Sequence, residues 1–215
     1  MTKTIFIPAK SKTSLNKIKI LEISKKLPKT IDMAYSIQFK DLAFQIKDIL
    51  ELQNHKIKKI VQVLGCSNPR FSKETQAVLL IGSGKFHAVS LAYETKLPIY
   101  ILENKSFSKI SSSDLEIFGK KQKSNQLRLL NSNNIGILVS TKPGQENLSR
   151  SLDLKKKLES KGKKVYMFIN NSIDVKELEN FPDVEVWINT ACPRLDMNSK
   201  DLLNIGDVEK ILFHL

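Results

Sequence analysis

The two cysteines of the chain are the residues with the most specific chemistry. Cys66 ends the stretch VLGC, and Cys192 lies within NTACPR. Pro193 follows Cys192 and has no backbone donor, and Arg194 adds a fixed positive charge close by. A neighbouring cation favours the thiolate, which is the form that binds metals and acts as a nucleophile. Cysteine followed by proline also occurs in iron–sulfur ligand runs.

Each cysteine also has a simpler interpretation. A free cysteine is most often a small, buried apolar side chain. The two cysteines lie too far apart in the sequence for their spacing to indicate a shared ligand set, and no Cys/His cluster has the spacing of a zinc site. Two cysteines are too few for a disulfide framework. From the residues alone, a thiolate site and a pair of core cysteines are both open.

The stretch IGSGKFH, residues 81–87, is a Gly-x-Gly turn between an apolar run and a helical run. Glycines in such a turn let backbone N–H groups approach an anion at a helix N-terminus. The third glycine of a dinucleotide fingerprint is missing, and no Ser or Thr follows Gly84-Lys85 as a P-loop requires. His87 is either a site residue or a helix-end hydrogen-bonding residue.

A second turn, STKPGQ, covers residues 140–145. The side chain of Gln145 both donates and accepts hydrogen bonds, which suits recognition of an amino-acid group. The alternative is an ordinary Pro-Gly turn.

The elements that must position these residues follow from hydrophobic periodicity. Apolar runs alternate with amphipathic runs, which predicts parallel sheets with helices on both faces. Ligands of such sheets bind at the carboxyl ends of strands, where the residues above fall. The predicted strands are 31–37, 77–81, 98–102, 135–140, 165–169 and 184–188. The predicted helices are 41–52, 86–96, 114–131 and 148–160.

The second half of the chain repeats the order of the first, as strand, glutamine-containing turn and helix. We therefore predict an α/β fold of two related small parallel-sheet units. Residues 1–108 form the unit that carries Cys66 and the GSGKFH turn, and residues 109–215 form the unit that carries the STKPGQ turn and Cys192. The polar stretch 103–113 contains the expected boundary.

Composition restricts the partners and the compartment. The chain has 215 residues and a net charge of +13, from 35 Lys and Arg against 22 Asp and Glu. The lysines are spread along the whole sequence without interleaved aromatic residues, so nucleic acid is not the favoured partner. No apolar run is long enough to cross a bilayer, and the first residues lack the layout of a signal peptide. We expect a cytoplasmic protein without a membrane partner.

Four motifs in the same order resemble one family: QVLGC, VLLIGSGKFH, GILVSTKPGQ and INTACPRLD. They resemble the archaeal diphthamide synthases, which carry out the first step of diphthamide biosynthesis, and the resemblance runs from IFIPA to CPRLD. It implies three related α/β domains around a [4Fe–4S] cluster, with one cysteine from each domain and one iron open to S-adenosylmethionine. It further implies that a 3-amino-3-carboxypropyl radical adds to a histidine of elongation factor 2.

The resemblance also assigns residues of this chain. Cys66 and Cys192 are the implied cluster ligands. Gln145 and Arg194 are implied to hold the amino-acid end of the substrate, since arginine suits a carboxylate. No residue is assigned a catalytic role. The implied cofactor-binding residues are Gly82, Ser83, Gly84, His87, Gln145 and Arg194.

One feature of the family has no counterpart in this sequence: a first domain with its own cysteine in a Tyr-Gly-Ala-Cys type motif. The chain thus supplies two of three expected thiolates. Either another polypeptide supplies the domain, or the sequence is a fragment, or a homo-oligomer completes the site, or the chain is a degenerate accessory subunit. We expect a homo- or hetero-oligomer. The alternative functions are a non-catalytic partner subunit and a basic RNA- or ribosome-associated module.

Overall fold

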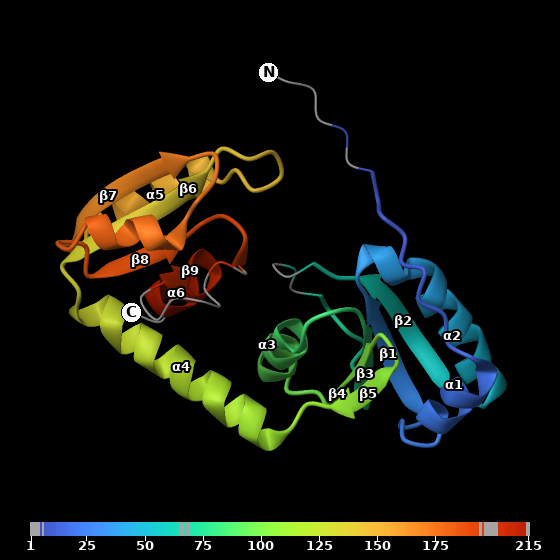
Figure 1. The fold of residues 1–215 in the computed structure, drawn as a ribbon. Coiled ribbons are helices and arrows are strands. Elements are labelled where there is room, and N and C mark those ends of the chain that lie inside the picture. Colours follow the sequence, from blue (N-terminus) through green and yellow to red (C-terminus); the bar gives the residue numbers. More distant parts are fainter. Residues whose placement is uncertain are drawn as a thin grey trace. The chain divides into compact units, whose positions relative to one another are not determined.

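The computed structural model describes residues 5, 7–64, 67, 69–193, 195 and 202–213. The chain forms two compact units, the first extending to Gly119 and the second beginning at Lys120. Each unit has its own sheet (Figure 1). The two units meet within the helix α4 (Ser112–Asn131), and not after residue 108 as expected. The difference arises because the first half of this helix packs on the core of the first unit.

The first unit contains a five-stranded sheet in the order β2-β1-β3-β4-β5. The first four strands pair in parallel, and β5 pairs antiparallel with β4. The strands are β1 (Thr30–Tyr35), β2 (Lys56–Gln62), β3 (Ala77–Ile81), β4 (Ile99–Glu103) and β5 (Ser106–Lys109). The helices are α1 (Lys17–Ser24), η1 (Ile37–Phe39), α2 (Lys40–Leu52), α3 (Lys85–Thr95) and the first half of α4.

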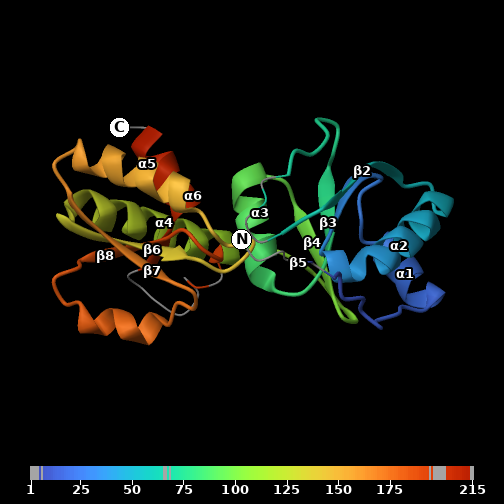
Figure 2. The ribbon, with the colours of Figure 1, turned by 90° about the horizontal axis from the view of Figure 1, so that it is seen from above.

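Helices cover both faces of this sheet. Side chains of α1 and α2, such as Ile46 and Leu50, pack on one face, and side chains of α3, such as Ala88, pack on the other. Figure 2 shows α1 and α2 on one side of the strands and α3 on the opposite side. Every residue of β3 is buried, as a strand covered on both faces requires. Because helices pack on both faces of the sheet, the sequence of β3, Ala77–Ile81, is an unbroken apolar run.

The second unit contains a four-stranded, fully parallel sheet in the order β7-β6-β8-β9. The end of α4, α5 and α6 cover one face. The other face carries η2 and an aromatic cluster of Phe168, Phe181 and Trp187. The elements are β6 (Asn134–Ser140), α5 (Leu148–Glu159), β7 (Lys164–Asn170), η2 (Val175–Asn180), β8 (Val186–Asn189), β9 (Leu202–Asn204) and α6 (Ile205–Phe213).

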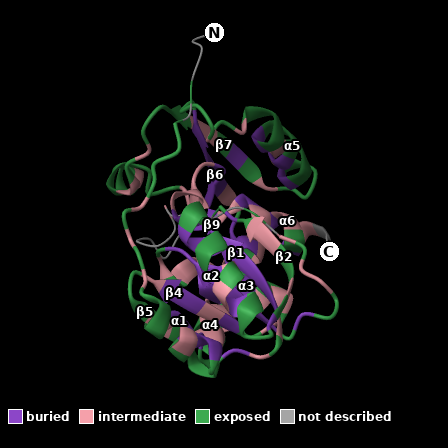
Figure 3. Cartoon of the chain, turned by 90° about the vertical axis from the view of Figure 1, so that its right-hand side faces the viewer, coloured by how far each residue is buried: buried purple, intermediate pink, exposed green. Residues whose placement is uncertain are grey.

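The two units share a topology. When the strands of each unit are counted along the chain, both sheets have the order second, first, third, fourth, and β5 is an addition to the first unit. In both units the central strands are buried beneath helices with exposed outer faces, whereas the edge strands β2, β5 and β7 are partly exposed (Figure 3). The predicted fold of two related parallel-sheet α/β units is confirmed. Among the described residues, no helix has the length and apolar character needed to cross a membrane.

Among the described residues, seven elements lie outside the predicted set: α1, η1, β2, β5, η2, β9 and α6. The polar stretch expected to be a loop contains β5, so the first sheet is not wholly parallel. The strand predicted to end at residue 37 ends at Tyr35, where the chain turns into η1.

Candidate functional site

The predicted site residues follow the carboxyl ends of strands. In the first unit, the Gly82–Gly84 turn follows β3; Cys66 follows β2 in the chain but lies outside the described residues. In the second unit, Gln145 follows β6 and Cys192 follows β8. Carboxyl ends of parallel strands meet at one edge of a sheet. The described candidate residues of each unit therefore lie along one edge of its sheet.

The loop that carries Cys192 is held by the side chain of Asn189, which is 1% exposed. Asn189 Nδ2 donates to the carbonyl oxygen of Cys192 at 2.8 Å and to Oδ1 of Asn204 at 2.8 Å. Asn189 Oδ1 accepts from the N–H of Ala191 at 2.9 Å. Asn204 Nδ2 in turn donates to the carbonyl oxygen of Pro193 at 3.4 Å. The loop is thus tied to two neighbouring strands, β8 and β9.

A buried threonine fixes the base of the same loop. Thr190 Oγ1 donates to the carbonyl oxygen of Leu138 on β6 at 2.8 Å and lies 3.1 Å from Ser151 Oγ of α5. Asn147, the residue before α5, donates from Nδ2 to the carbonyl oxygen of Thr190 at 2.7 Å. Asn147 lies just after the turn that contains Gln145. The structure therefore brings the Gln145 turn and the Cys192 loop together at one edge of the sheet.

The chemistry of the second unit centres on the thiol of Cys192. The residue is partly exposed, and no disulfide involves it. A partly exposed thiol on a fixed loop can ligate a metal or react as a nucleophile. Arg194, whose charge was expected to assist, lies outside the described residues.

The glycine turn of the first unit is already occupied by an acidic side chain. The N–H of Gly84, at the start of α3, donates to Glu103 Oε1 at 2.8 Å. Gly84 has a φ of +100°, a conformation that favours glycine. The anion expected at this helix N-terminus is thus supplied by the protein itself, from the end of β4. The turn presents an acidic side chain at the edge of the sheet.

Close packing also explains why residue 82 is glycine. A Cβ at Gly82 would lie 2.7 Å from Oγ of Ser36, the residue that follows β1. The N–H of Ser36 donates to the carbonyl oxygen of Ile81 at 3.0 Å, which holds the two strand ends together. The side chain of Ser83 makes no contact that helps to explain this packing.

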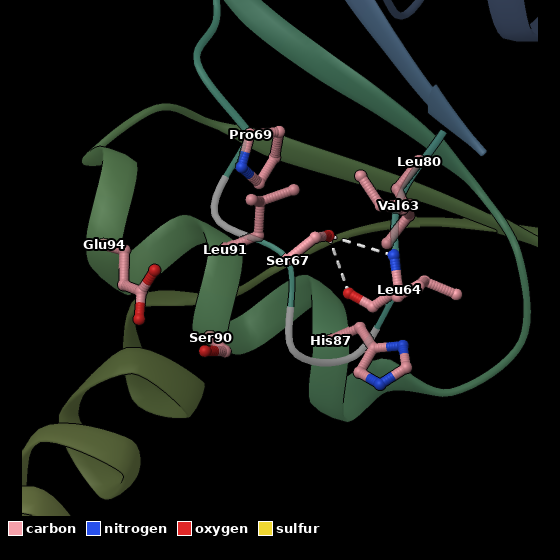
Figure 4. A pocket seen from close by; sticks show the side chains of 9 residues that line it. All are labelled: Val63, Leu64, Ser67, Pro69, Leu80, His87, Ser90, Leu91 and Glu94. Atoms are coloured by element: carbon pink, nitrogen blue, oxygen red, sulfur yellow. Dashed lines mark hydrogen bonds between the residues drawn. The ribbon is translucent and has the colours of Figure 1, made fainter. Parts of the chain in front are cut away.

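His87 lies on α3 and lines a small hollow of the first unit (Figure 4). Leu64 and Ser67, which are close to Cys66 in the sequence, line the same hollow. Ser67 Oγ accepts from the N–H of Leu64 at 2.9 Å and donates to its carbonyl oxygen at 2.8 Å, which closes a tight turn. The hollow has a volume of about 30 Å³, enough for a water molecule and too small for a nucleoside cofactor.

A larger hollow lies at the amino end of β4 and has a volume of about 720 Å³. Its lining combines the end of α3 with the beginning of α4 and includes Tyr93, Lys96 and Leu115. None of the predicted site residues lines it.

One buried acidic residue of the first unit was missed by the sequence analysis. Asp32 lies on β1 and is fully buried. Its Oδ1 accepts from the N–H of Lys59 at 2.9 Å, and its Oδ2 accepts from the N–H of Ser72 at 2.7 Å. Lys59 lies within β2 and Ser72 lies before β3, so Asp32 joins β1 to its neighbouring strand and to the segment that leads into β3. The signal in the sequence was a carboxylate within the apolar strand IDMAY.

The donor set fits a shared cluster only in part. Within the described residues, no three His, Cys, Asp or Glu side chains gather as a metal site. Cys192 fits the part of a single thiolate ligand, because its loop is fixed and its side chain is partly exposed. A complete cluster therefore requires donors beyond those that the described residues bring together.

Fold and site define a class: a chain of two matched α/β units, with a candidate ligand loop at the carboxyl edge of each sheet. Comparison with known proteins identifies the family. A family model described as "Putative diphthamide synthesis protein" matches residues 1–202, and the chain belongs to this family.

Two archaeal relatives illustrate the extent of the match. The 2-(3-amino-3-carboxypropyl)histidine synthase of Pyrococcus horikoshii is 29% identical over 228 residues, covering 97% of this chain and 65% of that protein. The synthase of Methanocaldococcus jannaschii is 31% identical over 205 residues, covering 90% of this chain and 56% of that protein. The chain thus spans less than two thirds of the length of either relative.

Solved structures of this family also resemble the chain. The crystal structure of Dph2 from Pyrococcus horikoshii with a 4Fe-4S cluster is similar, with a TM-score of 0.79 and 26% sequence identity, over 96% of this chain and 64% of that one. A human protein named 2-(3-amino-3-carboxypropyl)histidine synthase subunit 1 is 28% identical over 142 residues, covering 64% of this chain and 32% of that protein.

Proposed function

We propose that this chain acts in the first step of diphthamide biosynthesis, as part of a 2-(3-amino-3-carboxypropyl)histidine synthase. The substrates are S-adenosylmethionine and a histidine of elongation factor 2, and the working form is a complex in which further polypeptide supplies a third cysteine. The observation that carries the proposal is the fixed, partly exposed Cys192 loop in a chain of the diphthamide synthesis family. A human relative is named as subunit 1 of the synthase, and this name supports a complex.

Cys66 and Cys192 are the residues of this chain that would hold a [4Fe–4S] cluster. When bound, such a cluster supplies the electron that breaks a carbon–sulfur bond of S-adenosylmethionine. Gly82, Ser83, Gly84 and His87 would line the cofactor side. Glu103, at the same turn, offers a hydrogen-bond acceptor to the amine group of the substrate.

The second unit would bind the carboxylate of the substrate. Gln145 and Arg194 would bind it, with Arg194 able to make two parallel hydrogen bonds. Because Asn147 ties the Gln145 turn to the Cys192 loop, a substrate held by Gln145 lies at the same edge as the thiol of Cys192.

The proposal predicts the behaviour of the isolated chain from the count of ligands. Three thiolates leave one iron open for the substrate, whereas two leave two irons weakly held. The isolated chain should therefore hold iron poorly after anaerobic reconstitution and transfer little or no aminocarboxypropyl group. A polypeptide that carries a third cysteine domain should restore both properties. Transfer at full rate by the isolated monomer would contradict the proposal.

Cysteine substitutions test the same point within the complex. Cys192→Ala and Cys66→Ala should each abolish transfer of label from S-adenosylmethionine, labelled in the aminocarboxypropyl carbons, to elongation factor 2. Arg194→Ala should instead raise the substrate concentration needed for half-maximal rate. Both measurements require anaerobic conditions and a chemical reductant.

A non-catalytic partner subunit is the second candidate, because a human relative is named as subunit 1 of the synthase. In that case a true synthase would supply the whole cluster. The two cysteine variants would then leave transfer unchanged, and the wild-type chain would still raise the rate of its partner.

A further inference from the structure

Side-chain amides at the carboxyl edge of the second sheet surround the backbone on both sides of the Cys192–Pro193 bond. Asn189 holds the carbonyl oxygen of Cys192, and Asn204 holds the carbonyl oxygen of Pro193. The two amides are also joined to each other at 2.8 Å. Proline fixes its own φ near −65°. Two successive peptide planes and the intervening φ are thus determined, which leaves the χ1 torsion of Cys192 as the main freedom of the thiol.

We propose that Asn189 and Asn204 form a positioning clamp that sets where the Cys192 thiol lies; the importance of that position rests on the proposed role of Cys192 as a cluster ligand. Asn189 is suited to this task because a carboxamide has two N–H donors and an acceptor. Both of its hydrogens and its oxygen are used, by Cys192, Asn204 and Ala191. A ligand that must meet a shared cluster needs a side chain held in place before the cluster binds.

The clamp is distinct from the contacts that anchor the base of the loop. Thr190 and Ser151 lie under the loop and bond to β6, to each other and to the start of α5. Neither side chain touches the carbonyl oxygens of Cys192 and Pro193. Ser151→Ala therefore serves as the matched control, since it removes a fully buried hydrogen-bonding side chain from the same region and leaves the clamp in place.

Thiol reactivity reports on the clamp without any cluster. The chain has two cysteines, so a Cys66→Ser background leaves Cys192 as the sole thiol. The measurement is the rate of alkylation by iodoacetamide in the full-length folded chain, with circular dichroism to verify the fold. Asn189→Ala and Asn204→Ala should each raise the rate about tenfold, because a loop that loses such hydrogen bonds opens more often. Ser151→Ala should leave the rate within about twofold of the parent.

Asn189→Asp provides a sharper version of the test. An aspartate keeps the shape of the side chain but places an acceptor against the carbonyl oxygen of Cys192 and against Asn204. Alkylation should again accelerate, despite the similar volume. Asn204 is less buried than Asn189, so Asn204→Ala keeps the test valid if an Asn189 variant fails to fold.

Two results would overturn the clamp: alkylation rates unchanged in the Asn189 and Asn204 variants, or an equal rise in Ser151→Ala, which would indicate general loosening. The proposed function is tested separately, by the iron retained after anaerobic reconstitution of the complex with Cys192→Ala. Faster alkylation in the clamp variants together with unchanged iron in Cys192→Ala would support the clamp and contradict the ligand role.

Discussion

Buried polar side chains on strands hold neighbouring segments of the chain in both units. Asp32 and Asn189 are almost wholly inaccessible to solvent; Asp32 accepts from the N–H groups of Lys59 on β2 and of Ser72, and Asn189 holds the Cys192 loop. Burying a carboxylate or an amide costs free energy unless its hydrogen-bonding groups are satisfied. Asp32 meets this condition by binding backbone N–H groups of β2 and of the segment before β3, and Asn189 meets it by binding the Cys192 loop and Asn204. The burial of Asn189 therefore couples the order of the Cys192 loop to the stability of the second sheet.

Removal of the Asp32 carboxylate should destabilise the first unit. Asp32→Ala leaves the N–H groups of Lys59 and Ser72 without their acceptor, and a lost partner of this kind costs about 1–3 kcal/mol each. We expect the free energy of unfolding to fall by about 2–4 kcal/mol. Urea denaturation followed by circular dichroism measures the change. The exposed Asp183→Ala should shift it by less than about 0.5 kcal/mol; equal effects would refute a special role for Asp32.

The close packing of the Gly82–Gly84 turn leads to a second prediction. Gly82→Ala places a methyl group 2.7 Å from Oγ of Ser36, so the turn must shift. The free energy of unfolding should fall by about 1–3 kcal/mol, as for other overpacked sites. Ser36→Ala removes the clashing oxygen and should restore most of the loss in the double variant. If the double variant is as unstable as the sum of the single changes, the clash is not the cause.

The longer helices α2–α5 and the central strands follow from the sequence, whereas the edge strands β2, β5 and β9 do not. The strands β3 and β6 could be predicted because they are buried, and their sequences are therefore long apolar runs. β2 has the sequence KIKKIVQ. It is an edge strand that is largely exposed and carries lysines, so it has no long apolar run by which to predict it. β5 reads SFSK and is a strand only because its backbone pairs with β4. Pairing of this kind depends on the tertiary fold, which local periodicity does not contain.

The same distinction applies to the candidate site. The Gly82–Gly84 turn, Gln145 and Cys192 were predicted because residues of these types stand directly after apolar runs. Their partners were not, because Glu103 and Asn204 reach them from neighbouring strands that are distant in sequence. The register of the sheets decides which strand end lies beside which.

An ion pair between two helices should give the first unit a specific dependence on pH. Lys85 at the start of α3 contacts Asp114 in the first turn of α4 at 2.8 Å. The Lys85 ammonium, followed by the Ser111 hydroxyl and N–H, lowers the pKa of Asp114 from 3.8 to about 2. Since the pKa is lower in the folded state, the contribution to stability is present above about pH 4 and is lost as the pH falls toward 2.

The test compares urea midpoints between pH 2 and pH 5. Asp114→Asn should flatten the fall of the midpoint in this window relative to wild type, because it removes the titrating group. Asp183→Asn leaves the Lys85–Asp114 pair intact and should retain the wild-type slope. An Asp114→Asn curve parallel to wild type throughout the window would contradict the assignment.

At the scale of the whole chain, the two units have separate cores. One pair of buried clusters contains residues of β1–β4 with α1–α3, and another pair contains residues of β6–β9 with α5 and α6. Cooperative opening follows the boundaries of such cores. We therefore expect each unit to respond to its own substitutions.

Gly136 provides the perturbation for this prediction. A Cβ at Gly136 on β6 would lie 2.4 Å from the ring of Trp187 on β8, so Gly136→Ala must displace the indole. Native-state hydrogen exchange should become faster in β6–β9 and remain unchanged in β1–β4. Gly206→Ala is the control, because a Cβ there meets no atom within 4 Å. Faster exchange in both sheets would show that the units unfold together.

The shared topology of the units has a consequence for their ancestry. Cys66 follows the second strand of its unit, whereas Cys192 follows the third. An alignment that superimposes the two repeats therefore sets the Cys192 loop against the Gly82–Gly84 turn, and the Cys66 loop against the segment after β7. Neither counterpart contains a cysteine. If the repeats arose by duplication, the common ancestor passed on the fold, and the thiols have separate evolutionary origins.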